Sequence, residues 1–187
     1  MTITALDPKT ALVLIDLQKG IVSFPVAHHI DGVIKNAAAL ASVWRARGLP
    51  VVLVNVTGGA PGRTQAQRFS GPFPDGWADL VPELDQQPSD LTITKKTWGA
   101  FHATDLEEKL RALGVTHIVL GGVSTSIGVE TTARQAYERG FNVTLATDAM
   151  TDMFPDVHEN SVNRIFPRLG ELGTTQEIIA TLNQAQA

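Results

Sequence analysis

Short apolar stretches recur along the chain at a spacing that suits a sheet of buried strands. Each stretch is apolar nearly throughout, whereas a strand with one solvent-facing side would alternate apolar and polar residues. Continuous apolar runs are typical of parallel strands that are covered on both faces. We therefore expect strands at residues 11–16, 51–56, 91–94, 117–122 and 142–147.

Between these strands, apolar residues recur at the spacing of one helix face. The pattern predicts helices at 30–47, 104–113 and 127–139, and a last helix that opens with Thr174 and Glu177 in capping-box spacing. Strands that alternate with helices predict an α/β fold. We expect a three-layer αβα sandwich around a right-handed, doubly wound and mostly parallel sheet.

Residues 57–90 interrupt this alternation of strands and helices. They are rich in glycine and proline and lack a sustained apolar period, so we expect a long loop that contains a short helical piece. Long loops of this kind in a compact domain usually cover or shape a site.

The composition narrows the class of protein. The length of 187 residues fits a single domain, expected to span 1–187, and 43% hydrophobic with 18% charged residues is typical of a globular rather than a disordered chain. The net charge of −4 with scattered basic residues argues against a nucleic-acid partner. No apolar run approaches the roughly 20 residues that span a bilayer. The first residues carry no basic leader with an apolar segment, so we expect a cytoplasmic protein without a membrane partner.

Three polar features follow predicted strands. Asp16 ends the first strand, Lys95 directly follows the third, and the glycine-rich segment 121–128 follows the fourth. Ligands of open α/β sheets bind beyond the carboxyl ends of the strands, so the three features mark a candidate site. Each also has a purely structural explanation: a turn aspartate, a solvated lysine, and glycines that relieve a tight turn.

Four stretches of the sequence resemble successive blocks of the isochorismatase-like hydrolases, in the order that this family has them: "ALVLIDLQKG", "ITKKTWGAFHATDLEEKL", "VLGGVSTSIGVETTARQAYERGFNVTLATDAMTD" and "HENSVNRIF". The resemblance covers about residues 10 to 180 and implies a sheet of six strands. It implies that Asp16 is the catalytic aspartate and Lys95 the catalytic lysine. Gly128 stands where the family's amidases have their nucleophilic cysteine. A cis peptide between Val123 and Ser124 and a homo-oligomer, a dimer or a tetramer, are also implied.

The chain has no cysteine, so the thiol chemistry of the family's amidases is excluded. The namesake isochorismatases resemble this chain in having glycine at that position, and they hydrolyse a vinyl ether, for which acid catalysis suffices. We therefore expect a hydrolase of a small molecule in which Asp16 and Lys95 cleave a C–O bond of the vinyl-ether type, with Asp16 as the acid. Lys95 would hold a substrate carboxylate or stabilise negative charge, and Val123, Ser124 and the helix start near Gly128 would form an anion-favouring corner.

Several alternatives stay open. The site could hydrolyse an amide or urea C–N bond with directly activated water, or the scaffold could be a binding module without catalysis. A serine or threonine nucleophile is disfavoured because no hydroxyl occupies the position of Gly128. A phosphate-handling domain is remoter, since Asp16-Leu17-Gln18 supplies no G-x-G-x-x-G.

The surroundings of the site are less determined by the sequence. Phe24, Trp98, Phe101 and Ile127 are candidates for an apolar pocket wall, although each suits core packing as well. True isochorismatases carry an arginine where this chain has Thr97, and Arg63 is a candidate for the missing positive charge. We expect no metal and no cofactor, because the histidines show no ligand spacing; they lie at 28, 29, 102, 117 and 158.

Overall fold

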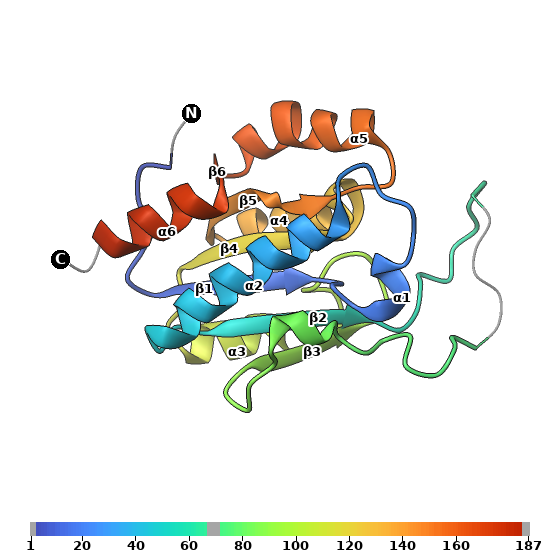
Figure 1. The fold of residues 1–187 in the computed structure, drawn as a ribbon, viewed down its shortest axis with the longest axis horizontal. Helices are drawn as coiled ribbons and strands as arrows, with labels where there is room; N and C mark the ends of the chain where they lie inside the picture. Colours follow the sequence, from blue (N-terminus) through green and yellow to red (C-terminus); the bar gives the residue numbers. More distant parts are fainter. Residues whose placement is uncertain (1–2, 67–71, 185–187) are drawn as a thin grey trace.

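Six parallel strands form one sheet in the computed structural model, which describes residues 3–66 and 72–184 (Figure 1). The strand order β3-β2-β1-β4-β5-β6 places β1 and β4 in the centre, where every strand residue is buried. The strands are β1 (Thr10–Ile15), β2 (Val51–Val56), β3 (Leu91–Lys95), β4 (His117–Val123), β5 (Asn142–Thr151) and β6 (Glu171–Gly173).

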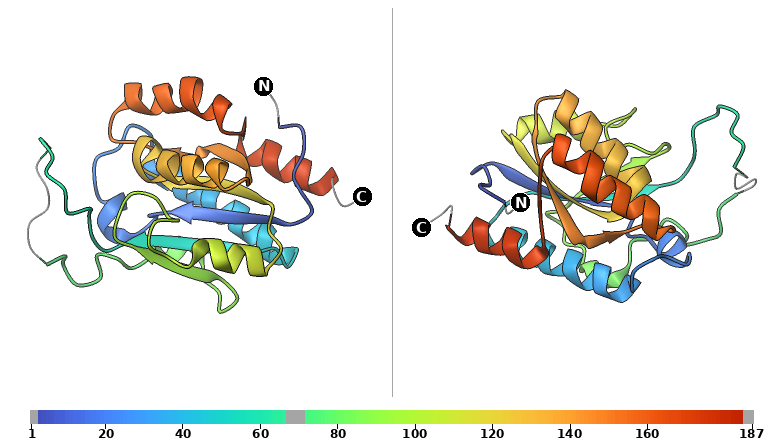
Figure 2. Two further views of the ribbon diagram at one scale, coloured as in Figure 1. Left: turned by 180° about the vertical axis from the view of Figure 1, so that it is seen from behind. Right: turned by 90° about the horizontal axis from the view of Figure 1, so that it is seen from above.

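Helices cover both faces of the sheet (Figure 2). One face carries α2 (Ile30–Ala46) and α6 (Thr175–Gln184), and the other carries α3 (Leu106–Ala112) and α4 (Glu130–Glu138). Alternate side chains of a strand point to opposite faces, so β1 serves both cores. Leu12 and Leu14 pack with α2 and α6, whereas Val13 and Ile15 pack with α3 and α4. The shorter elements are α1 (Lys19–Val22), η1 (Pro82–Leu84), η2 (Thr125–Val129), α5 (Pro155–Asn160), η3 (Ser161–Ile165) and η4 (Phe166–Arg168).

The register of the sheet aligns the strand ends that matter for the site. Ile15 pairs with both Val54 and Gly122, and Val56 pairs with Lys95. The chain passes so close to β1 at Gly122 that an added Cβ would lie 2.0 Å from the carbonyl oxygen of Ile15. Gly122 also has φ of +120°, a conformation that only glycine adopts without strain. The ends of β1, β3 and β4 are therefore fixed relative to one another.

The predicted α/β sandwich is confirmed, including the six parallel strands that the family resemblance implied. All five predicted strands are present, and β5 continues to Thr151, past the predicted end at 147. The sixth strand, β6, was not visible in the apolar pattern because it has three residues. The predicted helix 127–139 is partly wrong: a π-helical turn, η2, precedes α4, which begins at Glu130. The predicted capping box is present, since Thr174 and Glu177 exchange hydrogen bonds at the start of α6.

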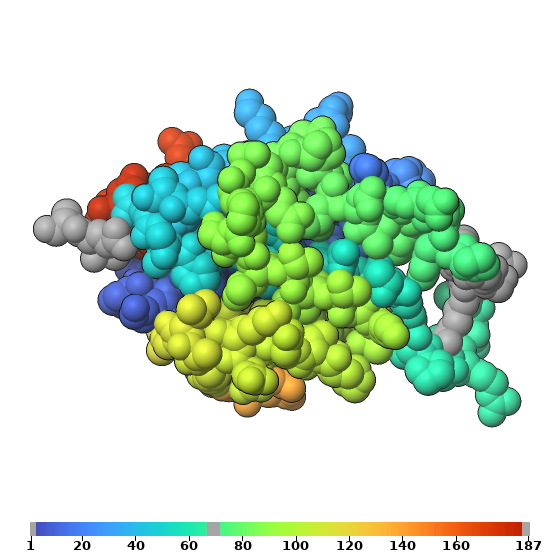
Figure 3. All heavy atoms as spheres, turned by 90° about the horizontal axis from the view of Figure 1, so that it is seen from below, coloured from blue at the N-terminus to red at the C-terminus, as the bar shows by residue number. Residues whose placement is uncertain are grey.

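The segment 57–90 is the long connection that the sequence predicts, and η1 is its short helical piece; residues 67–71 lie outside the described residues. From below, the green segment that follows residue 72 covers the middle of the molecule (Figure 3). The part of the segment that leads back to the sheet is fixed to the residues that follow β1. Lys19 N–H donates to Asp79 O and Val81 N–H donates to Leu17 O, at 2.8 and 3.1 Å. Within the described ranges, no helix combines the length and apolar character that crossing a bilayer requires.

Candidate active site

Asp16 and Lys95 meet at the carboxyl edge of the sheet. The Nζ of Lys95 donates to Oδ2 of Asp16 at 2.7 Å and to the carbonyl oxygen of Trp98, also at 2.7 Å. Asp16 directly follows β1 and Lys95 ends β3, so the lysine side chain reaches past the end of β2, which lies between them. Both residues are buried, with 5% of Asp16 and 1% of Lys95 exposed.

The carboxyl group of Asp16 is poorly provided with hydrogen-bond donors. Its Oδ1 is buried and has no partner among the described residues, so Lys95 is the side-chain donor that stabilises the charged form. Burial raises the pKa of Asp16 to about 6, although the ammonium of Lys95 acts in the opposite direction. A carboxyl group of this kind is partly protonated near neutral pH, which is the property that a general acid requires.

Gly128 lies directly beside this pair, in the turn η2. A Cβ added to Gly128 would stand 3.3 Å from Oδ2 of Asp16, 3.5 Å from Nζ of Lys95 and 2.8 Å from Cγ2 of Ile15. The position is thus within reach of both charged groups. Because residue 128 is glycine, no side-chain atom stands beside the two charged groups, and a Cβ there would require the buried Ile15 side chain to shift.

The turn before Gly128 contains the cis peptide bond between Val123 and Ser124 that the resemblance implied. The carbonyl oxygen of Ser124 accepts hydrogen bonds from the N–H groups of Ile127 and Val129, at 3.2 and 3.1 Å. These two N–H groups are therefore engaged within the protein. The anion-favouring role of Val123, Ser124 and the backbone near Gly128 stays a prediction.

Asp152 is a buried residue at this site that the sequence did not single out. Its Oδ2 accepts from the N–H and Oγ of Ser126, at 2.7 and 2.8 Å, and its Oδ1 accepts from the N–H of Met153, at 2.8 Å. Its carbonyl oxygen accepts from the N–H of Ala27, at 2.8 Å. Asp152 is 2% exposed and thus connects η2, the end of β5 and the loop before α2. In the sequence, Asp152 is marked only as the last residue of "ATDAMTD", within a block that resembles the family.

A cavity of about 540 Å³ opens over the Asp16–Lys95 pair. Eight of the residues that the sequence marked as catalytic or substrate-binding candidates line it: Asp16, Phe24, Lys95, Trp98, Val123, Ser124, Ile127 and Gly128. Phe24, Trp98 and Ile127 are 49%, 60% and 38% exposed, so they belong to the mouth of the cavity rather than to the core. Phe101, the fourth candidate, is 6% exposed and packs in the core instead.

The long loop supplies part of the cavity wall. Phe73 and Trp77 line it, and their rings stack with centroids 4.1 Å apart. Trp77 is fixed to α1, because its carbonyl oxygen accepts from the N–H of Gly20 at 2.9 Å and from Nε2 of the buried Gln18 at 3.3 Å. The sequence predicted a site-shaping loop but did not identify these aromatic residues, since no periodic pattern marks an irregular segment. Thr97 also lines the cavity, and its buried Oγ1 has no partner among the described residues.

Other candidates lie away from the cavity or point elsewhere. Arg63 is exposed and does not line the cavity. The hydroxyl of Thr125 is buried against Nδ1 of His158, at 2.8 Å, and that of Ser126 donates to Asp152. The ring of His158 packs on that of His28, with centroids 4.5 Å apart. None of these hydroxyls takes the position of the missing nucleophile.

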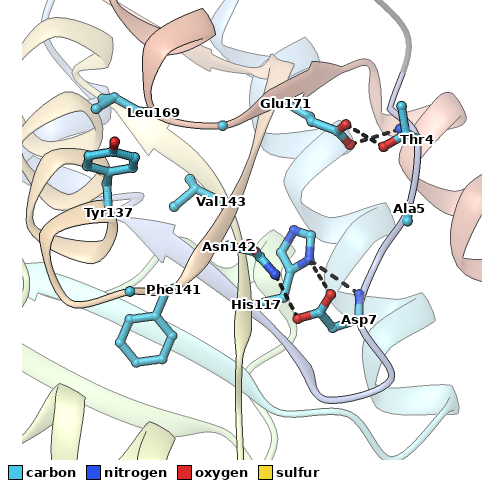
Figure 4. A pocket seen from close by; sticks show the side chains of 12 residues that line it. Thr4, Ala5, Asp7, His117, Tyr137, Phe141, Asn142, Val143, Leu169 and Glu171 are labelled. Atoms are coloured by element: carbon cyan, nitrogen blue, oxygen red, sulfur yellow. Dashed lines mark hydrogen bonds and ion pairs between the residues drawn. The ribbon is translucent and has the colours of Figure 1, made fainter.

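His117 lies at the opposite edge of the sheet, in a second cavity of about 450 Å³ at the amino ends of β4, β5 and β6 (Figure 4). There its Nδ1 lies 3.6 Å from Oδ1 of Asp7 and its Nε2 lies 2.9 Å from Oγ1 of Thr144. Burial lowers the pKa of His117, although Asp7 opposes this shift. Over residues 3–66 and 72–184, no cluster of three or more His, Asp or Glu side chains is arranged to hold a metal ion.

Comparisons with known proteins identify relatives of the whole chain. The family model for the isochorismatase domain matches residues 10–177. The isochorismatase family protein YecD of Escherichia coli O157:H7 is 43% identical over 180 residues, which are 92% of this chain and 96% of that protein. YwoC of Bacillus subtilis is 43% identical over 178 residues, 91% of this chain and 93% of that protein. The solved structure of an isochorismatase family protein from Burkholderia thailandensis has 39% identity and a TM-score of 0.93, covering 97% of this chain and all of that one. With a family model that spans most of its length and with these relatives, the chain belongs to the isochorismatase family of hydrolases.

Proposed function

We propose that this hydrolase cleaves a C–O bond of the vinyl-ether type in a small molecule, with Asp16 as the general acid. The observation that carries the proposal is the state of the Asp16 carboxyl group. It is buried, its Oδ1 has no partner among the described residues, and its pKa is raised to about 6. The Oδ2 atom of Asp16 also lies 3.3 Å from the position that a Cβ of Gly128 would take, in the lining of the cavity, where a substrate atom can approach.

The reaction needs one proton and one water molecule. Asp16 transfers its proton to the terminal carbon of the enol ether, and the C=C electron pair forms the new C–H bond. Water then adds to the cationic carbon and returns a proton to Asp16. The resulting hemiketal then collapses: its hydroxyl proton passes to the leaving oxygen, the C–O bond to that oxygen breaks, and an alcohol and a carbonyl compound form. No protein nucleophile takes part, which is consistent with Gly128.

Lys95 has a supporting role in this proposal. Its ammonium holds Oδ2 of Asp16 in place, and it is anchored in turn by the carbonyl oxygen of Trp98. After proton transfer the carboxylate is charged, and Lys95 stabilises that charge in a buried environment. The pair thus favours the step in which Asp16 gives up its proton.

The test is hydrolysis of ethyl vinyl ether and aryl vinyl ethers in D2O. Protonation of carbon by an exchangeable acid places one deuterium in the methyl group of the acetaldehyde that forms, and the spectrum of this product reports it directly. We expect turnover above the uncatalysed rate, with deuterium in the methyl group, and we expect it to survive EDTA. Hydrolysis of esters or amides in a parallel panel, without turnover of any vinyl ether, would refute the proposal.

A C–N hydrolase is the second candidate function. A more distant relative, a ureidoacrylate amidohydrolase of Rhizobium rhizogenes, is 26% identical over 215 residues. In this chain such a reaction would have to use water activated by ionised Asp16, because Gly128 provides no nucleophile. Its rate would rise with pH through about 6, where the acid mechanism would decline. Saturable binding without turnover of any substrate would instead indicate a binding module.

A further inference from the structure

We propose that the cavity selects a substrate that carries an uncharged planar ring. The proposal deepens the function above, because it names the substrate class of the same site. It is carried by the charges and the aromatic side chains of the cavity lining, and it can be tested by binding alone.

The described residues that line the cavity carry no net charge when Asp16 is ionised. Among the described residues that line it, the charged side chains are Asp16 and Lys95, which neutralise one another at 2.7 Å. Two of the three N–H groups of the Lys95 ammonium are already engaged, by Asp16 and by the carbonyl oxygen of Trp98. A substrate carboxylate would therefore be buried beside the Asp16 carboxyl group without a counter-charge of its own. This arrangement is unfavourable for an anion.

The walls of the cavity are aromatic. Phe24, Phe73, Trp77 and Trp98 come from three different segments of the chain, and all of them line the same space. Phe73 and Trp77 form a stacked pair with an angle of 19° between the rings. Aromatic rings bury a large apolar surface and prefer to pack on other planar groups. A flat ring fits such walls better than an aliphatic chain of the same polarity.

Trp77 is held in place against a glycine. A Cβ added to Gly20 would lie 2.1 Å from two atoms of the Trp77 indole ring, so the ring rests directly on the backbone of α1. The backbone N–H of Gly20 also binds the carbonyl oxygen of Trp77. Any side chain at position 20 must therefore displace the indole. This gives a way to disturb the aromatic wall without altering Asp16 or Lys95.

Polar recognition in this cavity suits an uncharged group. The Oγ1 of Thr97 is buried beside the cavity without a partner among the described residues. A hydroxyl can donate one hydrogen bond and accept others, so it pairs with a carbonyl, ether or amide group. It supplies no charge to compensate a carboxylate.

Three matched probes test the proposal in calorimetric titrations of the full chain at about pH 8, where Asp16 is ionised. Benzamide has an uncharged ring, benzoate is the same ring with a negative charge, and acetamide has the polar group without the ring. We expect benzamide to bind roughly tenfold more tightly than either of the other two. Benzoate binding as tightly as benzamide, or acetamide binding equally well, would overturn the proposal.

Two variants separate the contribution of the aromatic wall to benzamide affinity from the effect of adding a methyl group to a helix glycine. Gly20→Ala should weaken benzamide binding roughly fivefold or more, because the indole of Trp77 must move. Gly32→Ala is the matched control, since a Cβ at Gly32 meets no atom within 4 Å, and it should leave binding unchanged. If Gly20→Ala proves unstable by thermal melting, Phe73→Leu replaces it, with the same expected loss. Unchanged benzamide affinity in a folded variant would contradict the role of the aromatic wall.

The Asp16→Asn variant tests the charge argument and separates it from the proposed reaction. It removes the negative member of the pair and leaves Lys95 with a net positive charge. Benzoate should then bind about tenfold more tightly than to the unaltered protein, while benzamide binding should stay the same. Binding that follows this pattern, together with absent turnover of vinyl ethers by the unaltered protein, would retain the ligand class and refute only the proposed reaction.

Discussion

The ammonium of Lys95 lies 2.7 Å from Oδ2 of Asp16, a residue 79 positions earlier in the chain, whereas Oδ1 of the same carboxyl group is buried without a partner among the described residues. This asymmetry is chemically informative. A buried carboxylate that served only to hold the fold would be expected to accept hydrogen bonds at both oxygens. A carboxyl group with one strong donor and one free oxygen is suited to cycle between its protonated and ionised forms.

Replacement of Asp16 by asparagine should remove most of the hydrolytic activity. The amide preserves the shape of the side chain but cannot donate an acidic proton to substrate. We expect kcat/KM for the best vinyl ether to fall by roughly 10²–10⁴. The far-ultraviolet circular dichroism spectrum should be unchanged. Activity within a factor of about three of the unaltered protein would exclude Asp16 as the acid.

The pH dependence of activity should follow the raised pKa of Asp16. Because the acid must be protonated, kcat/KM should be constant below about pH 6 and fall about tenfold per pH unit above it. Initial rates in buffers of constant ionic strength from pH 4.5 to 8.5 measure the profile. A rate that instead rises through pH 6 would favour ionised Asp16 acting as a base, and thus the C–N alternative.

The free energy of unfolding should also depend on pH because the pKa of Asp16 is raised in the folded chain. The pKa of Asp16 is about 6 in the folded chain, above its ordinary value of 3.8, so between these values the folded state binds more protons than the unfolded state. The contribution of Asp16 to stability is therefore fully present below about pH 4 and is lost as the pH rises through about 6. Urea unfolding of the unaltered protein and of Asp16→Asn should show a difference that changes over this window. A constant difference would contradict the raised pKa.

Lys95→Met should move the activity profile toward higher pH. The methionine fills similar space but removes the positive charge that favours ionised Asp16, so the pKa of Asp16 should rise further above about 6. The descending limb of kcat/KM should shift upward by about one pH unit or more. Lys96→Met is the control. Lys96 is the exposed neighbour of Lys95, so the pH profile of this variant should match that of the unaltered protein. A lowered plateau without any shift would indicate that Lys95 acts on the substrate instead.

Gly128→Ala should lower activity without unfolding the chain. The added methyl group would stand 3.3 Å from Oδ2 of Asp16 and 2.8 Å from Cγ2 of Ile15, the branch methyl of a buried side chain that must shift to admit it. It would fill the space in which substrate or water is proposed to react, so we expect kcat/KM to fall at least about tenfold. A crystal structure or thermal melt would establish that the fold is kept. Full activity would show that the reacting atoms stand elsewhere.

Asp152→Ala should be strongly destabilising. The change leaves the N–H groups of Ser126 and Met153 and the hydroxyl of Ser126 without their acceptor, at a cost of roughly 2–4 kcal/mol in the free energy of unfolding. Asp156→Ala removes an exposed carboxylate four residues later and should cost no more than about 0.5 kcal/mol. Chemical denaturation of both variants gives the comparison. Equal effects would mean that Asp152 does not hold the three segments together.

The sequence predicted the parts of the fold that depend on long apolar runs. Five strands were found because each of them is buried on both faces, while the three-residue β6 is too short to leave a pattern. The turn η2 was predicted as ordinary helix, since the apolar positions of 127–139 do not distinguish a π-helical first turn from an α-helical one. The local hydrogen bonds of Ser124 and Asp152, which shape this turn, are tertiary and have no periodic signal.

For the site, the sequence located the residues at strand ends but not those that the long loop brings in. Asp16, Lys95 and Gly128 were found because parallel strands end at a common edge. The indole ring of Trp77 packs on the backbone of Gly20, which lies 57 positions earlier in the chain, and Phe73 stacks on that ring. Sequence patterns do not reveal such a contact between a helix and an irregular segment. Phe101 was an equal candidate for the wall, and its place in the core was decided by packing against Phe141.

Gly128 also bears on how the site responds to oxidants. A thiolate at that position would be converted by peroxide to sulfenic acid and beyond, and the enzyme would lose its nucleophile. Here the carboxyl and ammonium groups at the base of the cavity are inert to peroxide. Met153, 44% exposed at the mouth, is the oxidisable sulfur among the described lining residues. Sulfoxide formation there would make the entrance more polar and leave the groups beneath it intact.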